Sequence, residues 1–379
     1  MKKKIGVLGI TGSIGDSVIE IVKYHSEAFE IVFATAHSNY QKLFDISKQM
    51  KINKVALTSQ EIPFGYFSKQ HDAYPVTVLR GESEIINLIQ NEDYDILINA
   101  VSGSAGLSYT IAALMKGRDI ALANKESLVM AGHLIRDIIA KTGAKILPID
   151  SEHSAIFQVL HGHCMSEVKK LHLTASGGPF RLLPIEDFRK IELKDVLMHP
   201  IWSMGNKVTI DSATMMNKAL EVIEAHWLFN INYENINAII HPQSVIHSLV
   251  EFVDGSIVAQ MSVPTMQLPI LYALTYPMHY TSDKINTSLE ALPALTFEPI
   301  CKKRYPLFFL ALNAGKDGGI MPVVLNAANE VAQDMFIRGE ISFMDIYNIV
   351  DDALNRYENI SNPDLETILK INNEITKGK

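Results

Sequence analysis

The stretch "KIGVLGITGSIGDSVIEIVKYH", from Lys4 to His25, decides the fold of the first part of the chain. It is typical of a short apolar strand, a tight turn and a helix with apolar residues at three- and four-residue spacing. The turn carries Gly9, Gly12 and Gly15 in a G-x-x-G-x-x-G pattern. Glycines let the backbone approach a pyrophosphate, and the helix N-terminus offers N–H donors. We predict a dinucleotide-binding turn; the alternative is a tight turn without a ligand.

More apolar runs follow in the first 150 residues, and helical segments separate several of them. They are residues 30–36, 54–59, 95–101, 119–124 and 144–150. Strands without in–out alternation that are spaced by helices predict a parallel sheet covered on both faces. Such sheets bind ligands at the carboxyl ends of their strands. The predicted fold class is therefore α/β, with an N-terminal Rossmann-like parallel sheet.

Composition restricts the classes of protein to consider. The 379 residues suggest two or three domains at roughly 100–200 residues each. The net charge of −8 disfavours nucleic acid or an anionic membrane as a partner. The apolar start is interrupted by glycines, unlike a signal peptide, and no apolar run approaches the ~20 residues of a membrane helix. Cys164 and Cys301 lack metal-type spacing, so we expect reduced thiols and a cytoplasmic protein.

The segment "TAHSN", residues 35–39, indicates which dinucleotide is bound. NAD sites usually carry an acid here that bonds to the ribose 2′-hydroxyl, and this segment has none. His37, Ser38 and Asn39 can donate to a 2′-phosphate instead, which favours NADPH over NADH. No lysine or arginine lies within the segment, so we expect a neutral grip on that phosphate.

Two acids stand at the end of another apolar strand, in "ILPIDSEHSAIFQ", residues 146–158. Asp150 or Ser151 can cap the following helix, which would explain one acid without any ligand. Asp150 and Glu152 nevertheless repel each other unless a cation or a proton lies between them. We predict a metal site here.

A third acid lies in residues 211–229, which we predict to form one long amphipathic helix with Asp211 or Ser212 as its N-cap. Its polar stripe includes Asn217, Lys218 and Glu221. A solvated Lys–Glu pair is the ordinary alternative. In the functional interpretation, the first two meet the oxygens of a substrate and Glu221 completes the metal site. All-carboxylate ligation suits Mg²⁺ or Mn²⁺ rather than zinc.

A phosphate site is predicted at "TASGGPF", residues 174–180, where Ser176 and two glycines follow a strand. The N–H groups of such a loop can hold an anion. Ser212, at the predicted helix start, offers a second place, and Lys218 supplies positive charge. Together they indicate a small phosphorylated substrate.

Two further segments can face the ligands. Asn124 and Lys125 project at a predicted strand end, and Glu126 either contacts a ligand or complements the helix dipole. Residues 198–207 carry Trp202 and Met204 in a loop that is either a lid over the substrate or packed on the core. His199, taken alone, suits a structural role.

The rest of the chain contributes scaffold. Strands are predicted in residues 237–263, with a hairpin turn at Asp254-Gly255, and His241 and His247 suit structural roles. Residues 276–303 resemble a linker, and residues 304–379 resemble short helices. We divide the chain into an NADPH-binding domain (1–150), a catalytic, metal-binding and dimerisation domain of α+β type (151–275), a linker (276–303) and a C-terminal helical bundle (304–379).

Seven blocks of the sequence together resemble the 1-deoxy-D-xylulose 5-phosphate reductoisomerase family. They are "GITGSIG", "ALANKESLV", "PIDSEHSAIFQ", "TASGGPFR", "HPIWSMG", "IDSATMMNKALEVIEAHWLF" and "HPQSVIHSLV". The resemblance spans the chain in order. It implies a V-shaped homodimer that uses NADPH and a divalent cation to convert 1-deoxy-D-xylulose 5-phosphate into 2-C-methyl-D-erythritol 4-phosphate, in isoprenoid precursor synthesis.

The resemblance also implies residue roles. Metal ligands would be Asp150, Glu152 and Glu221. Substrate would contact Lys125, Ser151, Glu152, Ser176, His199, Trp202, Ser212, Asn217, Lys218 and Glu221, with Lys125, Glu152 and His199 catalytic. NADPH would contact Thr11, Gly12, Ser13, Ile14, His37, Ser38, Asn39, Asn124, Glu126 and Gly205. The family usually has a Gly-Lys-Asn-like stretch where this chain has His37-Ser38-Asn39.

Two other functions fit parts of the sequence. A plain NADPH-dependent dehydrogenase of a small phosphorylated aldehyde would need no metal and would not rearrange its substrate. An NADPH-sensing regulatory module would bind the cofactor without oxidising it, and would leave the three acids unexplained.

Overall fold

The computed structural model describes residues 1–59, 75–198 and 205–378. His199, Trp202 and Met204 therefore lie outside the described residues. The chain divides into two compact units. The first comprises Met1–Asn124, Ile135–Asp150 and Met266–Tyr280, and the second comprises Lys125–Leu134, Ser151–Thr265 and Thr281–Lys379. The finer division into four segments remains a prediction.

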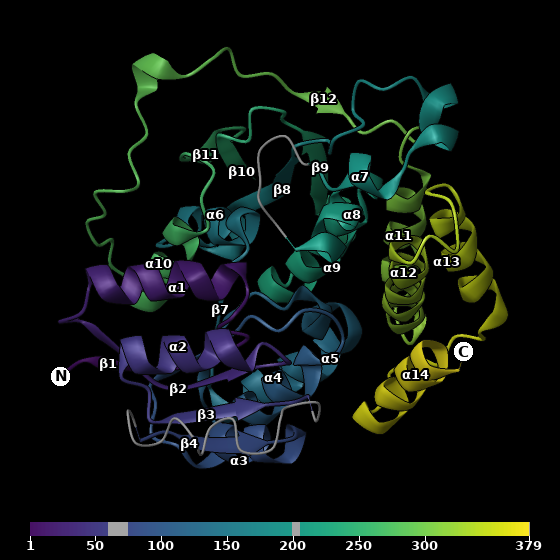
Figure 1. Cartoon of the computed structure of the whole chain (residues 1–379). Helices are drawn as coiled ribbons and strands as arrows, with labels where there is room; N and C mark the ends of the chain where they lie inside the picture. Colours follow the sequence, from purple (N-terminus) through teal and green to yellow (C-terminus); the bar gives the residue numbers. More distant parts are fainter. Residues whose placement is uncertain (60–74, 199–204, 379) are drawn as a thin grey trace. The chain divides into compact units, whose positions relative to one another are not determined.

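The first unit is built on a parallel seven-stranded sheet with strand order β4-β3-β2-β1-β5-β6-β7 (Figure 1). The α/β class and the parallel sheet are confirmed. The strands are β1 Lys3–Leu8, β2 Phe29–Ala36, β3 Lys54–Leu57, β4 Thr77–Arg80, β5 Ile96–Asn99, β6 Asp119–Leu122 and β7 Ile146–Pro148. Strand order reverses between β1 and β5, and dinucleotides bind at such a switch point. Edge strand β4 was not predicted, because its four residues lack the continuous apolar pattern of the others.

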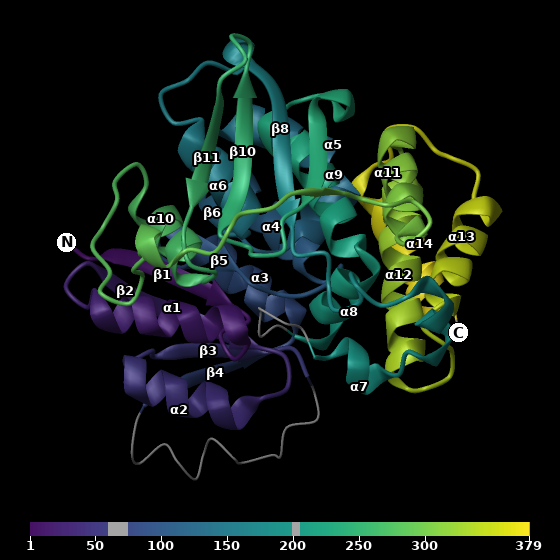
Figure 2. The same cartoon turned by 90° about the horizontal axis from the view of Figure 1, so that it is seen from above.

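Helices pack against this sheet, and both views show them around its strands (Figures 1 and 2). Helix α10 lies beside α1, and α3 beside α4. The helices are α1 Ser13–Tyr24, α2 Tyr40–Met50, α3 Glu82–Asn91, α4 Gly106–Met115, α10 Gln267–Thr275 and the second half of α5, Lys125–Thr142. Helix α5 has non-helical backbone at Ala131, and it is divided between the units, with Lys125–Leu134 in the second and the residues from Ile135 in the first.

The second unit contains a five-stranded mixed sheet with order β11-β10-β8-β9-β12. Its strands are β8 Val168–Ala175, β9 Ile236–Ile240, β10 Ile246–Phe252, β11 Ile257–Met261 and β12 Glu298–Pro299. The predicted hairpin at Asp254-Gly255 is confirmed, since β10 and β11 pair antiparallel around it. Helices α6, Ser151–Val159, and α9, Met216–Phe229, share a buried apolar cluster with β8 and β10.

The C-terminal residues of the second unit are helical, as predicted. They form α11 Pro306–Asp317, α12 Met321–Ile337, α13 Asp345–Arg356 and α14 Leu365–Lys377. Short elements complete the unit: α7 Leu193–Val196 and the 3₁₀ turns Met165–Glu167, Ile185–Lys190, Tyr233–Asn235 and Leu289–Ala291.

The prediction of one helix over residues 211–229 is wrong. Two helices occupy the region, α8 Asn206–Thr214 and α9, and they meet at Met215. Met215 has a φ of 63°, a left-handed conformation that ends a helix and that methionine seldom adopts. Asp211 and Ser212 therefore lie in the last turns of α8 and not at a helix start. The N-cap prediction is wrong, and Ser212 offers no helix N-terminus to an anion.

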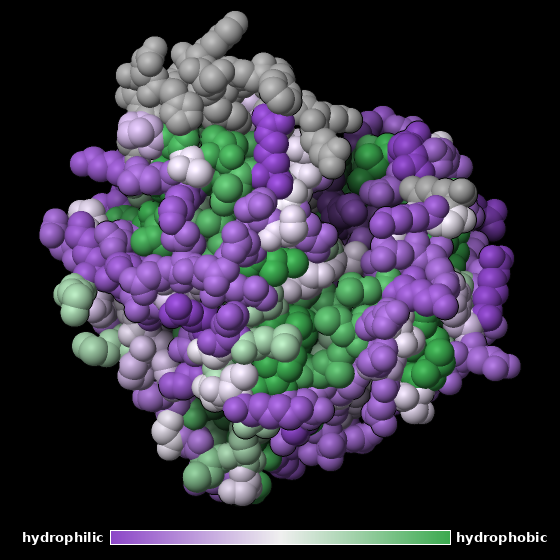
Figure 3. All heavy atoms as spheres, turned by 90° about the horizontal axis from the view of Figure 1, so that it is seen from below, coloured by the Kyte–Doolittle hydropathy of each residue, from purple (hydrophilic) through white to green (hydrophobic). Residues whose placement is uncertain are grey.

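The surface is mixed in character. Hydrophilic residues cover most of the face shown in Figure 3, and hydrophobic ones show between them, as is usual for a folded protein. Among the described residues, no helix has the length and apolar character needed to cross a membrane.

A substitution at Gly15 can show how closely the turn after β1 is packed. A Cβ atom there would overlap the backbone carbonyl of Ile10, which cannot rotate away as a side chain would. We expect Gly15→Ala to lower the free energy of unfolding by about 3 kcal/mol or more, measured by urea denaturation. Gly12→Ala is the stability control, since its Cβ would meet only ordinary contact distances. Equal stability of the two variants would contradict the packing argument.

Candidate active site

The glycine turn of the first unit lies beside the end of β2. The backbone N–H groups of Gly9 and Ile10 donate to the carbonyl of Thr35, at 3.1 and 3.0 Å. This brings Thr11 to Ile14, at the start of α1, next to His37 to Asn39, which follow β2. Gly12 and Ser13 are exposed, as a backbone that binds pyrophosphate requires.

Two of the three residues after β2 are already engaged. His37 Nδ1 lies 2.6 Å from Thr58 Oγ1, and the Asn39 side-chain oxygen caps α2 by accepting the N–H of Lys42 at 3.1 Å. The amide nitrogen of Asn39 and the exposed Ser38 hydroxyl can still donate to a ligand.

The other predicted cofactor residues lie apart along the chain. Asn124 is buried, and its amide donates to the carbonyls of Val101 and Gly103, which holds that loop. Glu126 lies in the first turn of α5, and Gly205 is the N-cap of α8. Their contacts with NADPH remain predictions.

Lys218 is the centre of the charged site in the second unit. Its ammonium donates to Glu152 Oε1 at 2.6 Å and also bonds to Glu221 Oε2. Lys125 Nζ bonds to Asn217 Oδ1 at 2.8 Å and to Glu221 Oε1 at 3.2 Å. The side chains of Lys218 and Glu221 are at most 4% exposed. The alternative of a solvated Lys–Glu pair is thereby excluded.

Electrostatics keep Lys218 charged in this setting. Burial alone lowers the pKa of Lys218, but the carboxylates of Glu152 and Glu221 outweigh it, so the pKa lies above its ordinary value. A buried ammonium between two carboxylates shows that this place attracts positive charge.

The third predicted metal ligand belongs to the same cluster. Asp150 is the last residue of the Ile135–Asp150 segment of the first unit, and it immediately precedes Ser151, the first residue of α6, in the sequence. One carboxylate oxygen from each of Asp150, Glu152 and Glu221 lies within 4.8 Å of the others. The set is made only of oxygens, which matches the ligand preference of Mg²⁺ and Mn²⁺. The donor chemistry therefore fits a divalent hard cation.

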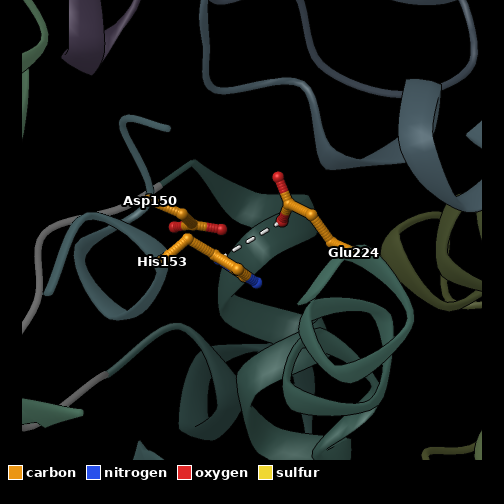
Figure 4. A group of neighbouring side chains, drawn as sticks. All are labelled: Asp150, His153 and Glu224. Carbon is orange, nitrogen blue, oxygen red and sulfur yellow. Dashed lines mark ion pairs between the residues drawn. The ribbon is translucent and has the colours of Figure 1, made fainter. Parts of the chain in front are cut away.

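A second group adjoins this cluster, formed by Asp150, His153 and Glu224 (Figure 4). His153 Nε2 lies 2.9 Å from the backbone oxygen of Glu221, and Nδ1 lies 3.4 Å from Glu224 Oε2. The Glu221 carbonyl only accepts hydrogen bonds, so Nε2 carries a hydrogen. Through this bond His153 fixes the backbone that presents Glu221.

The loop after β8 brings Ser176 towards α8. Gly177 and Gly178 have φ values of 84° and 67°, and a Cβ on Gly178 would touch the backbone of Ser212 and Ala213. Ser212 therefore does lie beside the Ser176 loop, although not at a helix N-terminus. The loop is anchored by Tyr305, whose buried hydroxyl donates to the Gly177 carbonyl at 2.7 Å.

Asp211, one residue earlier, connects α8 to α12. Its carboxylate accepts hydrogen bonds from Asn329 at 2.8 Å and from Gln333 at 2.5 Å. Burial raises the pKa of Asp211 to about 6.

Comparison with known proteins matches this arrangement. The 1-deoxy-D-xylulose 5-phosphate reductoisomerase model matches residues 5–132, its C-terminal domain model matches 146–229, and a DXP reductoisomerase C-terminal domain model matches 261–377. A relative of that name from Clostridium acetobutylicum is 43% identical over 376 residues, covering 99% of this chain and 98% of its own length. The chain belongs to the 1-deoxy-D-xylulose 5-phosphate reductoisomerase family.

Other members of the reductoisomerase family agree. A relative from Listeria monocytogenes serovar 1/2a is 44% identical over 373 residues, or 98% of this chain and 97% of its own. A crystal structure of a DOX-P reductoisomerase in complex with NADPH, fosmidomycin and magnesium is 38% identical, with a TM-score of 0.92 over 99% of this chain and 97% of that one. The enzyme from Zymomonas mobilis in complex with NADPH is 36% identical, with a TM-score of 0.91 over 100% and 98%. The fold implied by the resemblance is confirmed.

Several residues that contact the candidate site residues were not singled out from the sequence. Asp211 was considered only as an N-cap, and Tyr305 and Glu224 received no role. Tyr305 is 128 residues from Gly177 in sequence, and no local pattern marks that contact. Lys42, three residues after Asn39, carried a signal, since a lysine in the first turn of a helix opposes the helix dipole. His241 and His247, by contrast, are buried and hydrogen-bonded, as expected of structural histidines.

Asp211 predicts a pH dependence of stability. The folded-state pKa of Asp211, about 6, exceeds the ordinary 3.8, so folding favours the protonated carboxyl. Its contribution to the free energy of unfolding is therefore fully present below about pH 4 and is lost as the pH rises through about 6. Between these pH values the free energy of unfolding of the unmodified protein should fall, relative to Asp211→Asn, by up to about 3 kcal/mol. Urea denaturation from pH 4 to 7 measures this. Asp317→Asn, at an exposed position, should follow the unmodified protein; a parallel profile for Asp211→Asn would refute the prediction.

Tyr305 predicts a link between the helical region and the substrate loop. Tyr305→Phe leaves the Gly177 carbonyl without its donor, which should lower the free energy of unfolding by about 1–3 kcal/mol. Because the loop loses its anchor, KM for the sugar phosphate should rise while KM for NADPH stays unchanged. Tyr347→Phe is the matched control, on α13. An unchanged substrate KM for Tyr305→Phe would show that the anchor does not position Ser176.

Proposed function

We propose that this chain converts 1-deoxy-D-xylulose 5-phosphate to 2-C-methyl-D-erythritol 4-phosphate with NADPH and a divalent cation, Mg²⁺ or Mn²⁺. The observation that carries the proposal is the convergence of Asp150, Glu152 and Glu221 within 4.8 Å in a chain of this family. A simple dehydrogenase would not need this acidic group, and a regulatory module would not need two buried lysines beside it.

Asp150, Glu152 and Glu221 would hold the metal through their carboxylates. The polar side chains beside them would bind the substrate. When bound, the cation supplies a Lewis acid that polarises the substrate's carbonyl, and NADPH supplies the hydride. Lys125 and Asn217 donate to the substrate's oxygens and stabilise negative charge as it develops there. Ser151, Ser176, Ser212 and Lys218 bind the remaining oxygens and the phosphate, which adds binding energy remote from the reacting carbons.

The roles of His199 and Trp202 remain proposals from the family resemblance, because both lie outside the described residues. In this proposal Trp202 and Met204, which also lies outside the described residues, belong to a lid that shields the reaction from water, and His199 contacts the substrate. Gly205, the residue after Met204 in the sequence, is the N-cap of α8.

We further propose a cytoplasmic homodimer formed through the central region. Strand β11 is an edge of the five-stranded sheet, and its Ile257 and Val258 are 55% and 43% exposed. Apolar side chains on an edge strand suit an interface with another chain.

The acids test the metal assignment directly. We expect Glu221→Gln or Asp150→Asn to lower turnover at least about a thousandfold, because the site loses a ligand of the Lewis acid. The assay follows NADPH absorbance with the phosphorylated deoxyxylulose, with and without chelator, and identifies the product. Glu234→Gln, an exposed acid of the same unit, should retain activity. A wild-type rate for Glu221→Gln at saturating Mg²⁺ would overturn the assignment.

A further inference from the structure

Lys42 places a positive charge close to residues 35–39, where the sequence predicted only neutral groups to bind the 2′-phosphate. It lies in the first turn of α2, three residues after the cap Asn39. Its ammonium donates to the backbone carbonyl of Thr11 at 3.1 Å and pairs with Asp16 at 2.8 Å. The side chain therefore reaches from the helix after β2 back to the glycine turn after β1.

This position is electrostatically unfavourable for a lysine without an anion. The N-terminal turn of a helix carries partial positive charge, which favours acids and disfavours cations, and α2 has no acid in its first turn. Asp16 offsets part of the cost, but both side chains are substantially exposed, at 36% and 56%, so their pairing in water contributes little. A ligand with more negative charge can compete for the ammonium.

We propose that Lys42 supplies the positive charge that recognises the 2′-phosphate of NADPH and so sets the preference over NADH. The inference rests on the proposed function and names a residue for its cofactor specificity. Thr11 lies in the turn expected to hold the pyrophosphate, and Asn39 belongs to the segment expected to face the 2′-phosphate. Lys42 bonds to both, through its ammonium and its backbone N–H respectively. On cofactor binding, the ammonium exchanges Asp16 for the phosphate.

The test compares two ligands that differ only in the group of interest, adenosine 2′,5′-bisphosphate and adenosine 5′-monophosphate. Calorimetry measures their Kd for the unmodified protein, Lys42→Met and Lys42→Arg. Lys48→Met is the matched control, because Lys48 lies in the last turn of the same helix and is exposed. NADPH and NADH binding, followed by nicotinamide fluorescence, gives the same comparison on whole cofactors.

We expect Lys42→Met to weaken the bisphosphate about tenfold or more and to leave the monophosphate unchanged, as loss of a charge-assisted hydrogen bond predicts. Lys42→Arg and Lys48→Met should stay within about threefold of the unmodified protein on both ligands. Equal weakening of both ligands by Lys42→Met would show a structural role and overturn the proposal. So would a loss on Lys42→Arg as large as on Lys42→Met, because the charge would then not be the cause. If the unmodified protein binds NADPH no better than NADH, there is no preference for Lys42 to set and the Lys42 proposal is overturned. If the unmodified protein does not convert the sugar phosphate, the proposed function fails instead.

Discussion

The site depends on one buried ammonium, that of Lys218, held between Glu152 and Glu221. Removing Lys218 would take a positive charge away from both carboxylates at once, which is costly in a protein interior. The bonds also join the start of α6 to α9. Because His153, the next residue after Glu152, bonds to the backbone of Glu221, two consecutive residues of α6 hold α9 at two points. These bonds hold Glu152 and Glu221, two of the proposed metal ligands, to the scaffold of the second unit.

The left-handed backbone at Met215 lets α8 and α9 point in different directions. A continuous helix over residues 211–229 would carry Asp211 and Glu221 on one rigid cylinder, so both could not be oriented independently. The break lets α8 attach to α12 through Asp211, while α9 turns Lys218 and Glu221 towards α6.

Short-range sequence patterns predicted the elements whose conformation depends on neighbouring residues. They are the glycine turn, most of the parallel strands and the acids at the end of β7, which follow from hydrophobic periodicity and from the glycine and polar residues that end the strands. The helix break did not, because the left-handed position is filled by methionine and not by the glycine or asparagine that would mark it. Contacts such as Tyr305 with Gly177 join residues far apart in sequence, so only the folded chain reveals them. Lys42 lies three residues beyond the five-residue segment considered for the phosphate, and its side chain reaches the turn after β1, a contact that only the folded chain reveals.

Charge balance explains why lysines accompany the acids. The three proposed ligands Asp150, Glu152 and Glu221 contribute three negative charges. Lys125 and Lys218, which pair with two of them, contribute two positive charges, so these five residues carry a single negative charge before a cation binds. A divalent ion reverses that sign to a single positive charge, which suits the arrival of a phosphorylated substrate. Without the lysines, the cation would leave a net negative site that repels the phosphate. With more lysines, the carboxylates would be fully neutralised and the affinity for the cation would fall. Two lysines beside three acids therefore permit both the metal and the anionic substrate to bind at one place.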